Sequence, residues 1–200
     1  MSAPHGIRKD DCTFEEFLEI IKDGQKADLL DGVIYMASPD NTDANDLTAW
    51  LSTILRAFAD ARGLGKIYIL RVAYRIGKKH GPEPDIGFVP KRLERRRRRG
   101  YIDGPPTLAI EVVSPDSVAR DYLQKRALYE KAGVGEYWIL DPDEQRATFL
   151  VLRNKRYVEV APVDHVIKST VLPGLVLDVR WLTGRTRPGP YQVLQKLLEK

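Results

Sequence analysis

Two short apolar segments, residues 107–113 and 136–140, flank a stretch at 117–132 whose apolar residues follow helical spacing. Each apolar segment is short and nearly continuous, which is typical of a strand buried on both faces. A strand, a helix and a second strand in this order form a crossover between parallel strands. The chain is therefore predicted to adopt an α/β layered fold and not a β-sandwich.

Capping, turn and periodicity patterns predict further elements along the chain. Thr13 and Glu16 form a capping box at the start of a helix that should run to about Lys22, and Asp31-Gly32 marks a hairpin turn. The other predicted elements are a helix at 44–62, strands at 66–76 and 85–89, a strand meander at 146–160 and 174–179, and a short amphipathic helix at 191–199. Because hairpins precede the crossover, the central sheet should be mixed.

Composition and length predict one domain. The 200 residues are 43% hydrophobic, which suits a single domain over 1–200, with its core at about 13–180 and a C-terminal extension at 181–200. No segment approaches the roughly 18 apolar residues of a spanning helix, so we expect a protein that is cytoplasmic and not bound to a membrane. The single cysteine, Cys12, excludes an intrachain disulfide and a thiolate metal cluster.

A glutamate stands in the middle of the apolar segment 107–113. Strand periodicity puts Ala109, Glu111 and Val113 on one face, and a buried carboxylate there needs compensation. Lys125 completes the apolar stripe of the following helix and should therefore face the core. The other members of this stripe are Val118, Tyr122, Tyr129 and Ala132. The pattern predicts a contact between Glu111 and Lys125; Tyr122 and Tyr129 are expected to pack with their hydroxyl groups in water.

The Glu111 and Lys125 pair has two interpretations. It could be a structural ion pair, assisted by Asp121 one turn before Lys125. Alternatively, Asp85 opens the apolar strand in "HGPEPDIGFVP", where an acid helps neither propensity nor packing. Two carboxylates on neighbouring strands predict a site for a hard cation, Mg²⁺ or Mn²⁺, and a lysine beside them suits phosphodiester hydrolysis. Glu83 shares the strand parity of Asp85 and could replace it as ligand.

An arginine-rich segment, "KRLERRRRRG", lies between the strand of Asp85 and the strand of Glu111. If this segment is helical, four arginines share a face and could follow a phosphate backbone into the cleft: Arg92, Arg95, Arg96 and Arg99. The alternative is a solvated face. In that case, the phosphate contacts should come from Arg71, Arg75, Lys78 or Lys79. The net charge of +4 alone is weak support for a polyanionic partner.

Four sequence segments together resemble a known family. They are "ADLLDGVIYMASP", "PEPDIGFV", "LAIEVVSPDS" and "RDYLQKRALYEKAGVGEYWILDP". Over roughly residues 13–180 the chain is similar to the Uma-two family, restriction endonucleases of the PD-(D/E)XK nuclease fold. The resemblance implies a restriction-endonuclease-like three-layer core, a mixed central sheet flanked by helices, and an additional antiparallel strand meander. It also implies a magnesium-dependent (or manganese-dependent) endonuclease that acts on DNA, as a homodimer.

The resemblance also implies roles for individual residues. Asp85 matches the first acid and Glu111 the second, both as metal ligands, with the backbone carbonyl of Val112 as a third ligand. Val113 stands where the usual lysine would follow Glu111, and Lys125 takes the place of that lysine on the next helix.

Other positions carry supporting roles or departures. Asp28 stands where relatives have a glutamate and would be an outer acid that holds a metal-bound water, with Glu83 and Asp121 as further outer acids. Asn45 occupies a place where relatives commonly have a histidine. Glu136, Tyr137 and Trp138 are interpreted as strand residues that could form an interface.

Two functional classes fit these patterns. The first is a metal-dependent nuclease. The second is a catalytically weak nucleic-acid-binding or assembly module that keeps the fold and uses the Glu111 and Lys125 pair for structure. A small-molecule hydrolase lacks support because the sequence has no Gly-x-Ser-x-Gly motif. The three histidines are scattered, so a histidine metal site is not expected, although His80 lies near Asp85.

Overall fold

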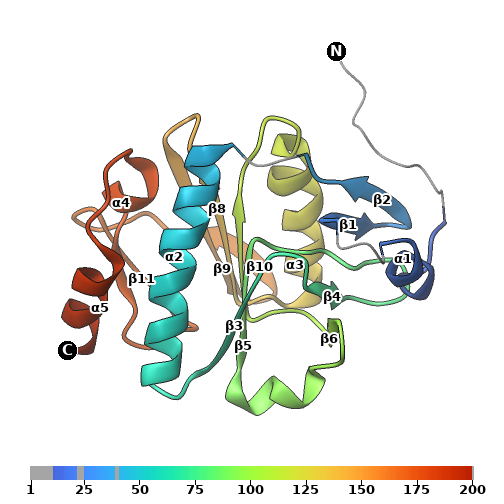
Figure 1. The fold of residues 1–200 in the computed structure, drawn as a ribbon, viewed down its shortest axis with the longest axis horizontal. Helices are drawn as coiled ribbons and strands as arrows, with labels where there is room; N and C mark the ends of the chain where they lie inside the picture. The colour runs from blue at the N-terminus through green and yellow to red at the C-terminus, as the bar shows by residue number, and fades with distance from the viewer. Residues whose placement is uncertain (1–10, 22–24, 39–40, 200) are drawn as a thin grey trace.

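The computed structural model describes residues 11–21, 25–38 and 41–199 (Figure 1). Its centre is a six-stranded sheet. The strands of this sheet are, in spatial order, β10 (Arg156–Glu159), β9 (Arg146–Arg153), β8 (Glu136–Asp141), β7 (Leu108–Val112), β5 (Ile86–Pro90) and β3 (Gly65–Ile69). β7 and β8 are parallel, and the other neighbours are antiparallel. The predicted crossover and the predicted mixed sheet are both confirmed.

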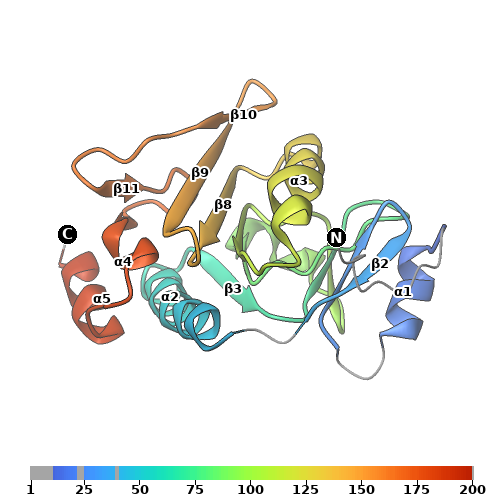
Figure 2. The ribbon, with the colours of Figure 1, turned by 90° about the horizontal axis from the view of Figure 1, so that it is seen from above.

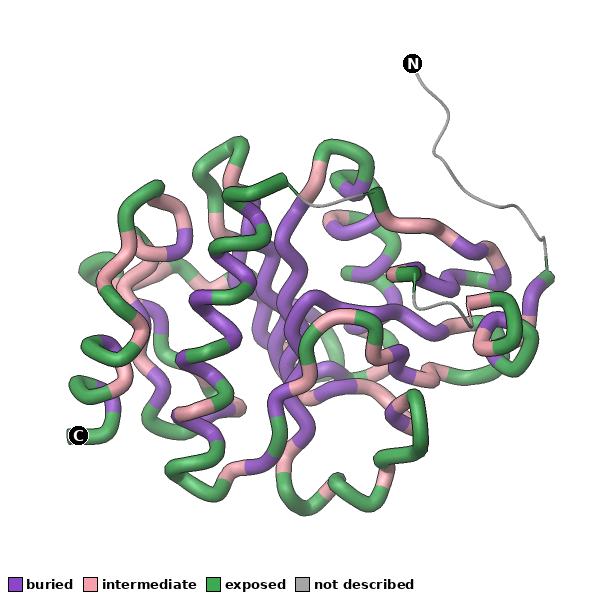
Figure 3. Tube along the Cα trace, viewed as in Figure 1, coloured by how far each residue is buried: buried purple, intermediate pink, exposed green. Residues whose placement is uncertain are grey.

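Helices cover both faces of this sheet. The helices of the described residues are α1 (Phe14–Ile20), α2 (Thr42–Ala61), the 3₁₀ helix η1 (Lys91–Arg96), the π-helical turn η2 (Arg120–Lys125), α3 (Arg126–Ala132), α4 (Arg180–Thr183) and α5 (Pro190–Leu198). Figure 2 shows α2 and α3 on opposite sides of the strands, with α4 and α5 beside α2. The sheet lies between them as the buried middle layer of Figure 3. This arrangement is the predicted three-layer core.

The two faces of β7 belong to different cores. Leu108 and Ile110 pack with α2 in a large apolar cluster, which also contains Val193 and Leu197 of α5. On the opposite face, Ala109 and the residue that follows β7, Val113, pack with Tyr129 of α3. The predicted strand parity is therefore confirmed, and Glu111 shares the face that packs against α3.

The N-terminal part forms the predicted capped helix and hairpin. Thr13 and Glu16 exchange both capping-box hydrogen bonds at the start of α1. β1 (Ala27–Leu30) and β2 (Val33–Met36) are joined by Asp31 and Gly32, both at positive φ, as a two-residue hairpin turn requires. Ala27 and Leu29 turn one face of the hairpin towards α1. The alternate positions of β1 are thus free to face the central sheet and α3.

The strand predicted at 66–76 is broken in two. Leu70 and Arg71 both have positive φ, which ends β3 and turns the chain away from the central sheet. The next strand, β4 (Ala73–Arg75), pairs instead with β6 (Tyr101–Asp103) in a separate two-stranded sheet. Periodicity could not locate this break because the turn uses no glycine or proline.

The helix predicted at 117–132 begins with the π-helical turn η2 and continues as α3. This turn changes the register of the predicted stripe. Val118 is 45% exposed, whereas Arg120 and Asp121 are buried. Lys125 and Tyr129 are buried as predicted. The predicted core-facing position is therefore wrong for Val118, at the N-terminal end of the stripe, and confirmed for Lys125 and Tyr129.

The C-terminal part forms the predicted meander and helix. β9 and β10 are a hairpin, and β11 (Val166–Lys168) pairs with β12 (Val176–Asp178). The amphipathic α5 packs against α2. Within the described residues, the structure contains no helix with the length and apolar content needed to cross a membrane.

Candidate active site

Asp85 and Glu111 lie side by side on neighbouring antiparallel strands. The register pairs Ile86 with Ile110, and one more step places Asp85 opposite Glu111. Opposite residues of an antiparallel pair point to the same face, with their Cβ atoms about 5 Å apart. Both side chains are buried. The N–H of Val112 donates a 2.7 Å hydrogen bond to Oδ2 of Asp85, which fixes the carboxylate against β7.

Lys125 reaches this pair from the helix above the sheet. Its Nζ lies 2.9 Å from Oε2 of Glu111 and 2.9 Å from Oδ2 of Asp28. Asp121, one turn earlier, is 3.4 Å away. The predicted contact between Glu111 and Lys125 and the assistance from Asp121 are both confirmed. Because three carboxylates surround one ammonium group, the lysine is fixed in place.

Asp28 and Glu83 link the hairpin to this group. Oδ1 of Asp28 accepts a 2.8 Å hydrogen bond from the N–H of Glu83, and the Nε of Arg120 lies 3.4 Å from Oδ2. The carboxylate of Glu83 accepts the N–H of Ala27 at 3.3 Å. Asp28 therefore contacts Lys125 directly, and Glu83 faces β1.

Lys26 is a site residue that the sequence analysis missed. It stands just before β1, and its Nζ forms an ion pair with Oδ1 of Asp85, 59 residues further along the chain. Strand parity could have suggested it, because Lys26 and Asp28 lie two residues apart and therefore share a face. The cue was weak, since one lysine before a strand is an ordinary surface feature.

Two expectations about aromatic residues were wrong. The hydroxyl of Tyr129 is not in water but donates a 3.0 Å hydrogen bond to Oε1 of Glu111. Tyr137 and Trp138, considered as interface residues, are fully buried in the core of the chain. Glu136 is also buried and accepts hydrogen bonds from Ser169 and Thr170.

We define the charged cluster by its eight residues: Lys26, Asp28, Glu83, Asp85, Glu111, Arg120, Asp121 and Lys125. It contains five carboxyl groups and three cationic groups. Burial raises the pKa of Glu111 to about 8 and the pKa of Glu83 to about 8. Burial alone would lower the pKa of Lys125, but Asp28 and Glu111 hold it well above the ordinary value. With all five acids ionised the cluster would have a net charge of −2, whereas the raised pKa values keep protons on Glu83 and Glu111 below about pH 8.

The donor set fits one small divalent cation. Asp85 and Glu111 supply hard carboxylate oxygens on one face, and two added charges would neutralise the charged cluster. Among the described residues, no three or more His, Cys, Asp or Glu side chains are grouped so that they could hold a metal ion. An ion at this place would therefore depend on two carboxylates, a backbone oxygen and waters, which is how Mg²⁺ is usually held.

The arginine-rich segment lies at the other end of the sheet. Asp85 precedes β5, whereas η1 follows β5, so about 20 Å of extended chain separates Asp85 from the arginines. η1 is the short helix at the bottom of Figure 1, between β5 and β6. It ends at Arg96, and the extended Arg97 follows, so Arg99 does not share a helical face with Arg92. The prediction that four aligned arginines lead into the site is wrong on this geometry.

The upstream cations differ in their partners. Arg75 pairs with Glu15, and Lys79 pairs with Asp11. Arg71 is exposed, and no ion pair or hydrogen bond of its side chain occurs within the described residues. Leu70, its neighbour, donates its N–H to the carbonyl of Asp85 at 3.2 Å. Arg71 therefore follows directly after a residue whose backbone contacts the backbone of Asp85.

Other polar residues lie outside the charged cluster. His80 accepts the N–H of Asp31 at Nδ1, 3.0 Å away, and so supports the hairpin turn. Asn45 is exposed on the first turn of α2. The structure gives neither residue a contact with the charged cluster.

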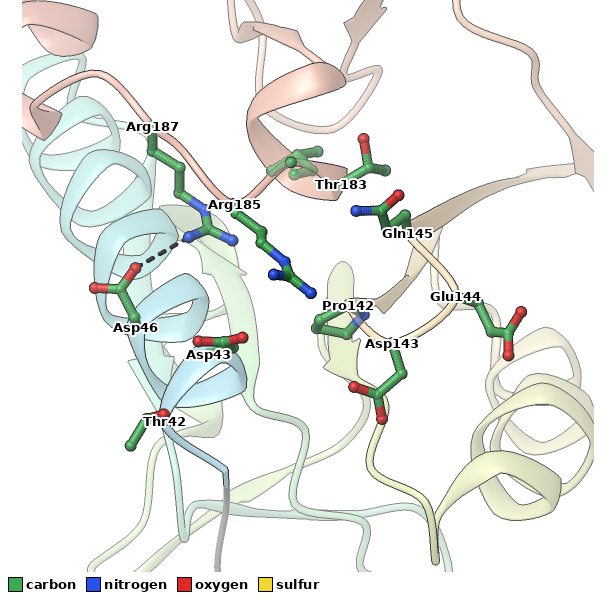
Figure 4. A pocket seen from close by; sticks show the side chains of 12 residues that line it. Thr42, Asp43, Asp46, Pro142, Asp143, Glu144, Gln145, Thr183, Arg185 and Arg187 are labelled. Carbon is green, nitrogen blue, oxygen red and sulfur yellow. Dashed lines mark hydrogen bonds and ion pairs between the residues drawn. The ribbon is translucent and has the colours of Figure 1, made fainter.

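A separate polar pocket of about 700 Å³ lies between the start of α2, the turn after β8 and the segment after α4 (Figure 4). Arg187 spans part of it and pairs with Asp46 at 3.0 Å. Arg185 points into the space, and Asp43 and Asp143 face it. No residue of the charged cluster lines this pocket. Four acids, Asp43, Asp46, Asp143 and Glu144, line it together with two arginines, Arg185 and Arg187.

The mixed sheet between helices, with acids on adjacent central strands and a lysine above them, defines the restriction-endonuclease-like class of folds. The profile of the Uma2 family, described as "Putative restriction endonuclease", matches residues 14–180. The chain therefore belongs to the Uma2 family, as the sequence resemblance predicted.

The fold is also similar to a solved structure. This is the crystal structure of a "putative nuclease belonging to DUF820" from Anabaena variabilis, with a TM-score of 0.64 and 18% sequence identity. The similarity covers 92% of this chain and 98% of that one. At this identity, the likeness supports the fold. No curated protein sequence matches the chain.

Proposed function

We propose that this protein is a metal-dependent nuclease that hydrolyses phosphodiester bonds of DNA. Asp85, Glu111 and the carbonyl of Val112 would hold Mg²⁺ or Mn²⁺. The observation that carries the proposal is the pair of carboxylates on adjacent strands with Lys125 2.9 Å from one of them. Membership of a family described as restriction endonucleases supports the same reaction class.

Each residue would have a distinct role. A bound divalent ion would lower the pKa of water and neutralise charge on the phosphate. Lys125 would orient the attacking water or stabilise charge that develops on the phosphate. Asp28 and Asp121 hold the ammonium of Lys125 at 2.9 Å and 3.4 Å, so they would act as positioning residues.

Arg71 is the phosphate contact that we propose among the cations upstream of Asp85. It is exposed, it follows the residue bonded to the Asp85 carbonyl, and its guanidinium has no ion pair among the described residues. Charge reversal, Arg71→Glu, should flatten the dependence of log affinity on log salt by more than the roughly 0.9 unit of one lost contact. Fluorescence anisotropy with a DNA duplex measures this slope.

The arginine-rich segment provides the comparison for Arg71. Reversing the charge of Arg95, Arg96 and Arg99 to glutamate tests whether a long duplex also contacts the arginine-rich segment. If the triple variant lost affinity for a 30-base-pair duplex but not for a 12-base-pair duplex, the segment would bind DNA at a distance from the charged cluster. A larger loss on the short duplex than Arg71→Glu produces would contradict the assignment of Arg71.

We further propose a homodimer, because a two-fold axis would present one active site to each of the two antiparallel strands of a duplex. Analytical ultracentrifugation of the free protein and of its DNA complex tests this. Two protomers per duplex support the proposal, and one protomer per duplex contradicts it.

The alternative function is a nucleic-acid-binding or assembly module without cleavage. Lys26 on Asp85 and Lys125 among three carboxylates also suit a purely structural ion-pair network. This alternative predicts DNA binding that is indifferent to divalent ions, whereas the nuclease requires them for cleavage.

A plasmid-cleavage assay separates the two functions. Glu111→Gln should reduce Mg²⁺- or Mn²⁺-dependent cleavage by about 10²- to 10³-fold, because one of two ligand carboxylates is lost. Glu136→Gln is the matched control, since Glu136 is also a buried strand glutamate but is bonded to Ser169 and Thr170. Equal activity of Glu111→Gln and Glu136→Gln would contradict the proposed function.

A further inference from the structure

Lys26 differs from the other groups that contact the two carboxylates. Its side chain is 21% exposed, whereas that of Lys125 is 3% exposed. It stands immediately before β1, at the rim of the charged cluster. The ion pair with Asp85 is the one contact of its ammonium group within the described part of the chain. Lys26 is therefore the charged group with the most freedom to move.

All four oxygens of Asp85 and Glu111 already have a partner from the chain. Oδ2 of Asp85 accepts the backbone N–H of Val112 at 2.7 Å. Oε1 of Glu111 accepts the buried hydroxyl of Tyr129 at 3.0 Å, and Oε2 is 2.9 Å from Lys125. The fourth oxygen, Oδ1 of Asp85, pairs with Lys26. A cation that binds between the carboxylates must compete with one of these partners.

The cost of displacing each partner identifies which one leaves. The N–H of Val112 belongs to the backbone of β7 and could leave Asp85 only if the strand moved. Tyr129 is fully buried, so its hydroxyl cannot turn into water. Lys125 would have to leave Glu111, Asp28 and Asp121 together. Lys26 would give up one ion pair and could move its charge into water along a flexible four-carbon stem.

We propose that Lys26 is an exchangeable counter-ion of the active site, which holds Asp85 when no metal is bound and moves to a substrate phosphate when a divalent ion takes its place. This inference rests on the proposed function and adds a residue to that site. Lys26 keeps Asp85 compensated while the protein is metal-free, and it lowers the apparent metal affinity because only the displaced state binds the ion. Once displaced, its ammonium lies at the rim beside the metal, where a phosphate has to approach.

Isothermal titration of chelator-treated protein with Mn²⁺ tests the first half. Lys26→Met should lower the dissociation constant for Mn²⁺ by about tenfold, the factor expected if Lys26 leaves Asp85 in about a tenth of the free molecules. Lys66→Met is the matched control, because Lys66 pairs with Asp60 at 2.7 Å on the exposed surface. This control should bind Mn²⁺ like the wild type.

Salt-dependent binding of a hydrolysis-resistant phosphorothioate duplex tests the second half. With Mn²⁺ present, Lys26→Met should reduce the magnitude of the log-log salt slope by about 0.9, the value of one phosphate contact. With chelator present, the slope should equal that of the wild type, because Lys26 is then held by Asp85. A purely structural lysine would not give a metal-dependent difference.

The outcomes separate this inference from the function on which it rests. If the wild type binds Mn²⁺ and Lys26→Met binds it equally or more weakly, the role of Lys26 is overturned and the nuclease proposal stands. The role is also overturned if the salt slope changes equally with and without Mn²⁺. If neither protein binds Mn²⁺, the metal site fails, and the inference fails with it.

Discussion

The two faces of β7 pack against helices of different character. One face carries Leu108 and Ile110 into the apolar core beneath α2. The other face carries Glu111 towards Lys125 beneath η2 and α3. The two environments are one residue apart in sequence, because successive side chains of a strand point to opposite faces. One strand thus carries apolar packing on one face and a buried charged group on the other.

The apolar face and the charged face should fail in different ways. The apolar face gains stability from burial and tight packing, so truncation there costs free energy of unfolding. The charged face depends on a balance of charge, so loss of one partner leaves an uncompensated ion in the interior. Substitutions on the charged face should therefore change both activity and stability, whereas substitutions on the apolar face should change stability alone.

The largest effect is expected for Lys125→Met. This change removes the ammonium from three buried carboxylates, and the free energy of unfolding should fall by about 3–5 kcal/mol at pH 7. Cleavage should be lost while Mn²⁺ affinity remains, since the lysine is not a ligand. Urea unfolding and calorimetric titration measure the two effects. The added change Asp28→Asn should recover part of the stability, because Lys125 and Arg120 hold the pKa of Asp28 below its ordinary value and the loss of Lys125 leaves this buried charge less compensated. No recovery would contradict the charge-balance account.

On the apolar face, Ile110→Ala should be nearly as destabilising but without the chemical effect. A buried isoleucine truncated to alanine costs about 2–5 kcal/mol through lost burial and the cavity left behind. Mn²⁺ affinity, measured under conditions where the variant is folded, should be unchanged. If Ile110→Ala weakened Mn²⁺ binding as strongly as Glu111→Gln does, the independence of the two faces would be refuted.

Strand parity made the separation of these faces predictable from the sequence. Ala109, Glu111 and Val113 share a face as expected, and the helical spacing pointed to Lys125. The π-helical turn, which includes the buried Arg120 and Asp121 of the charged cluster, does not follow the helical spacing from which the stripe was predicted.

Long-range contacts account for what the sequence did not reveal. Lys26 pairs with Asp85, 59 residues further along the chain, and its strand parity with Asp28 is only a weak local cue to this contact. The left-handed turn at Leu70 and Arg71 likewise carries no glycine that would have marked it. The arginine-rich segment follows β5, so it lies at the opposite end of this strand from Asp85, and the helical spacing of its arginines does not indicate at which end of the sheet they lie.

The charged face should also give the metal-free protein a dependence on pH. Burial raises the pKa of Glu83 and Glu111 to about 8, above the unfolded value of about 4.5. Between these values the folded state binds more protons than the unfolded chain, so the free energy of unfolding falls as pH rises. Each group contributes a slope of at most about 1.4 kcal/mol per pH unit.

Urea unfolding at pH 5 to 8 in the presence of chelator measures this slope. Glu83→Gln should make the slope less negative. Burial lowers the pKa of His80, which gives a slope of the opposite sign, but this contribution is the same in the wild type and in the variant. Parallel curves for the wild type and Glu83→Gln would show that Glu83 does not titrate in this window.

The smallest effect is expected for Tyr129→Phe. This change removes one hydrogen bond to Oε1 of Glu111 and leaves the ring packing against Tyr137. The free energy of unfolding should fall by about 1 kcal/mol at pH 7. Thermal unfolding in chelator measures it. A loss as large as that of Lys125→Met would mean that Tyr129, and not the lysine, is the main partner of Glu111.

The central claim is that the charged face of β7 holds a divalent ion between Asp85 and Glu111. Anomalous diffraction from crystals soaked with Mn²⁺ tests it most directly. We predict one strong peak at about 2.1 Å from an oxygen of each carboxylate, with Lys26 moved away from Asp85 and Lys125 still at Glu111. Crystals that show no peak at this place, with Lys26 still paired to Asp85 at saturating Mn²⁺, would contradict the claim.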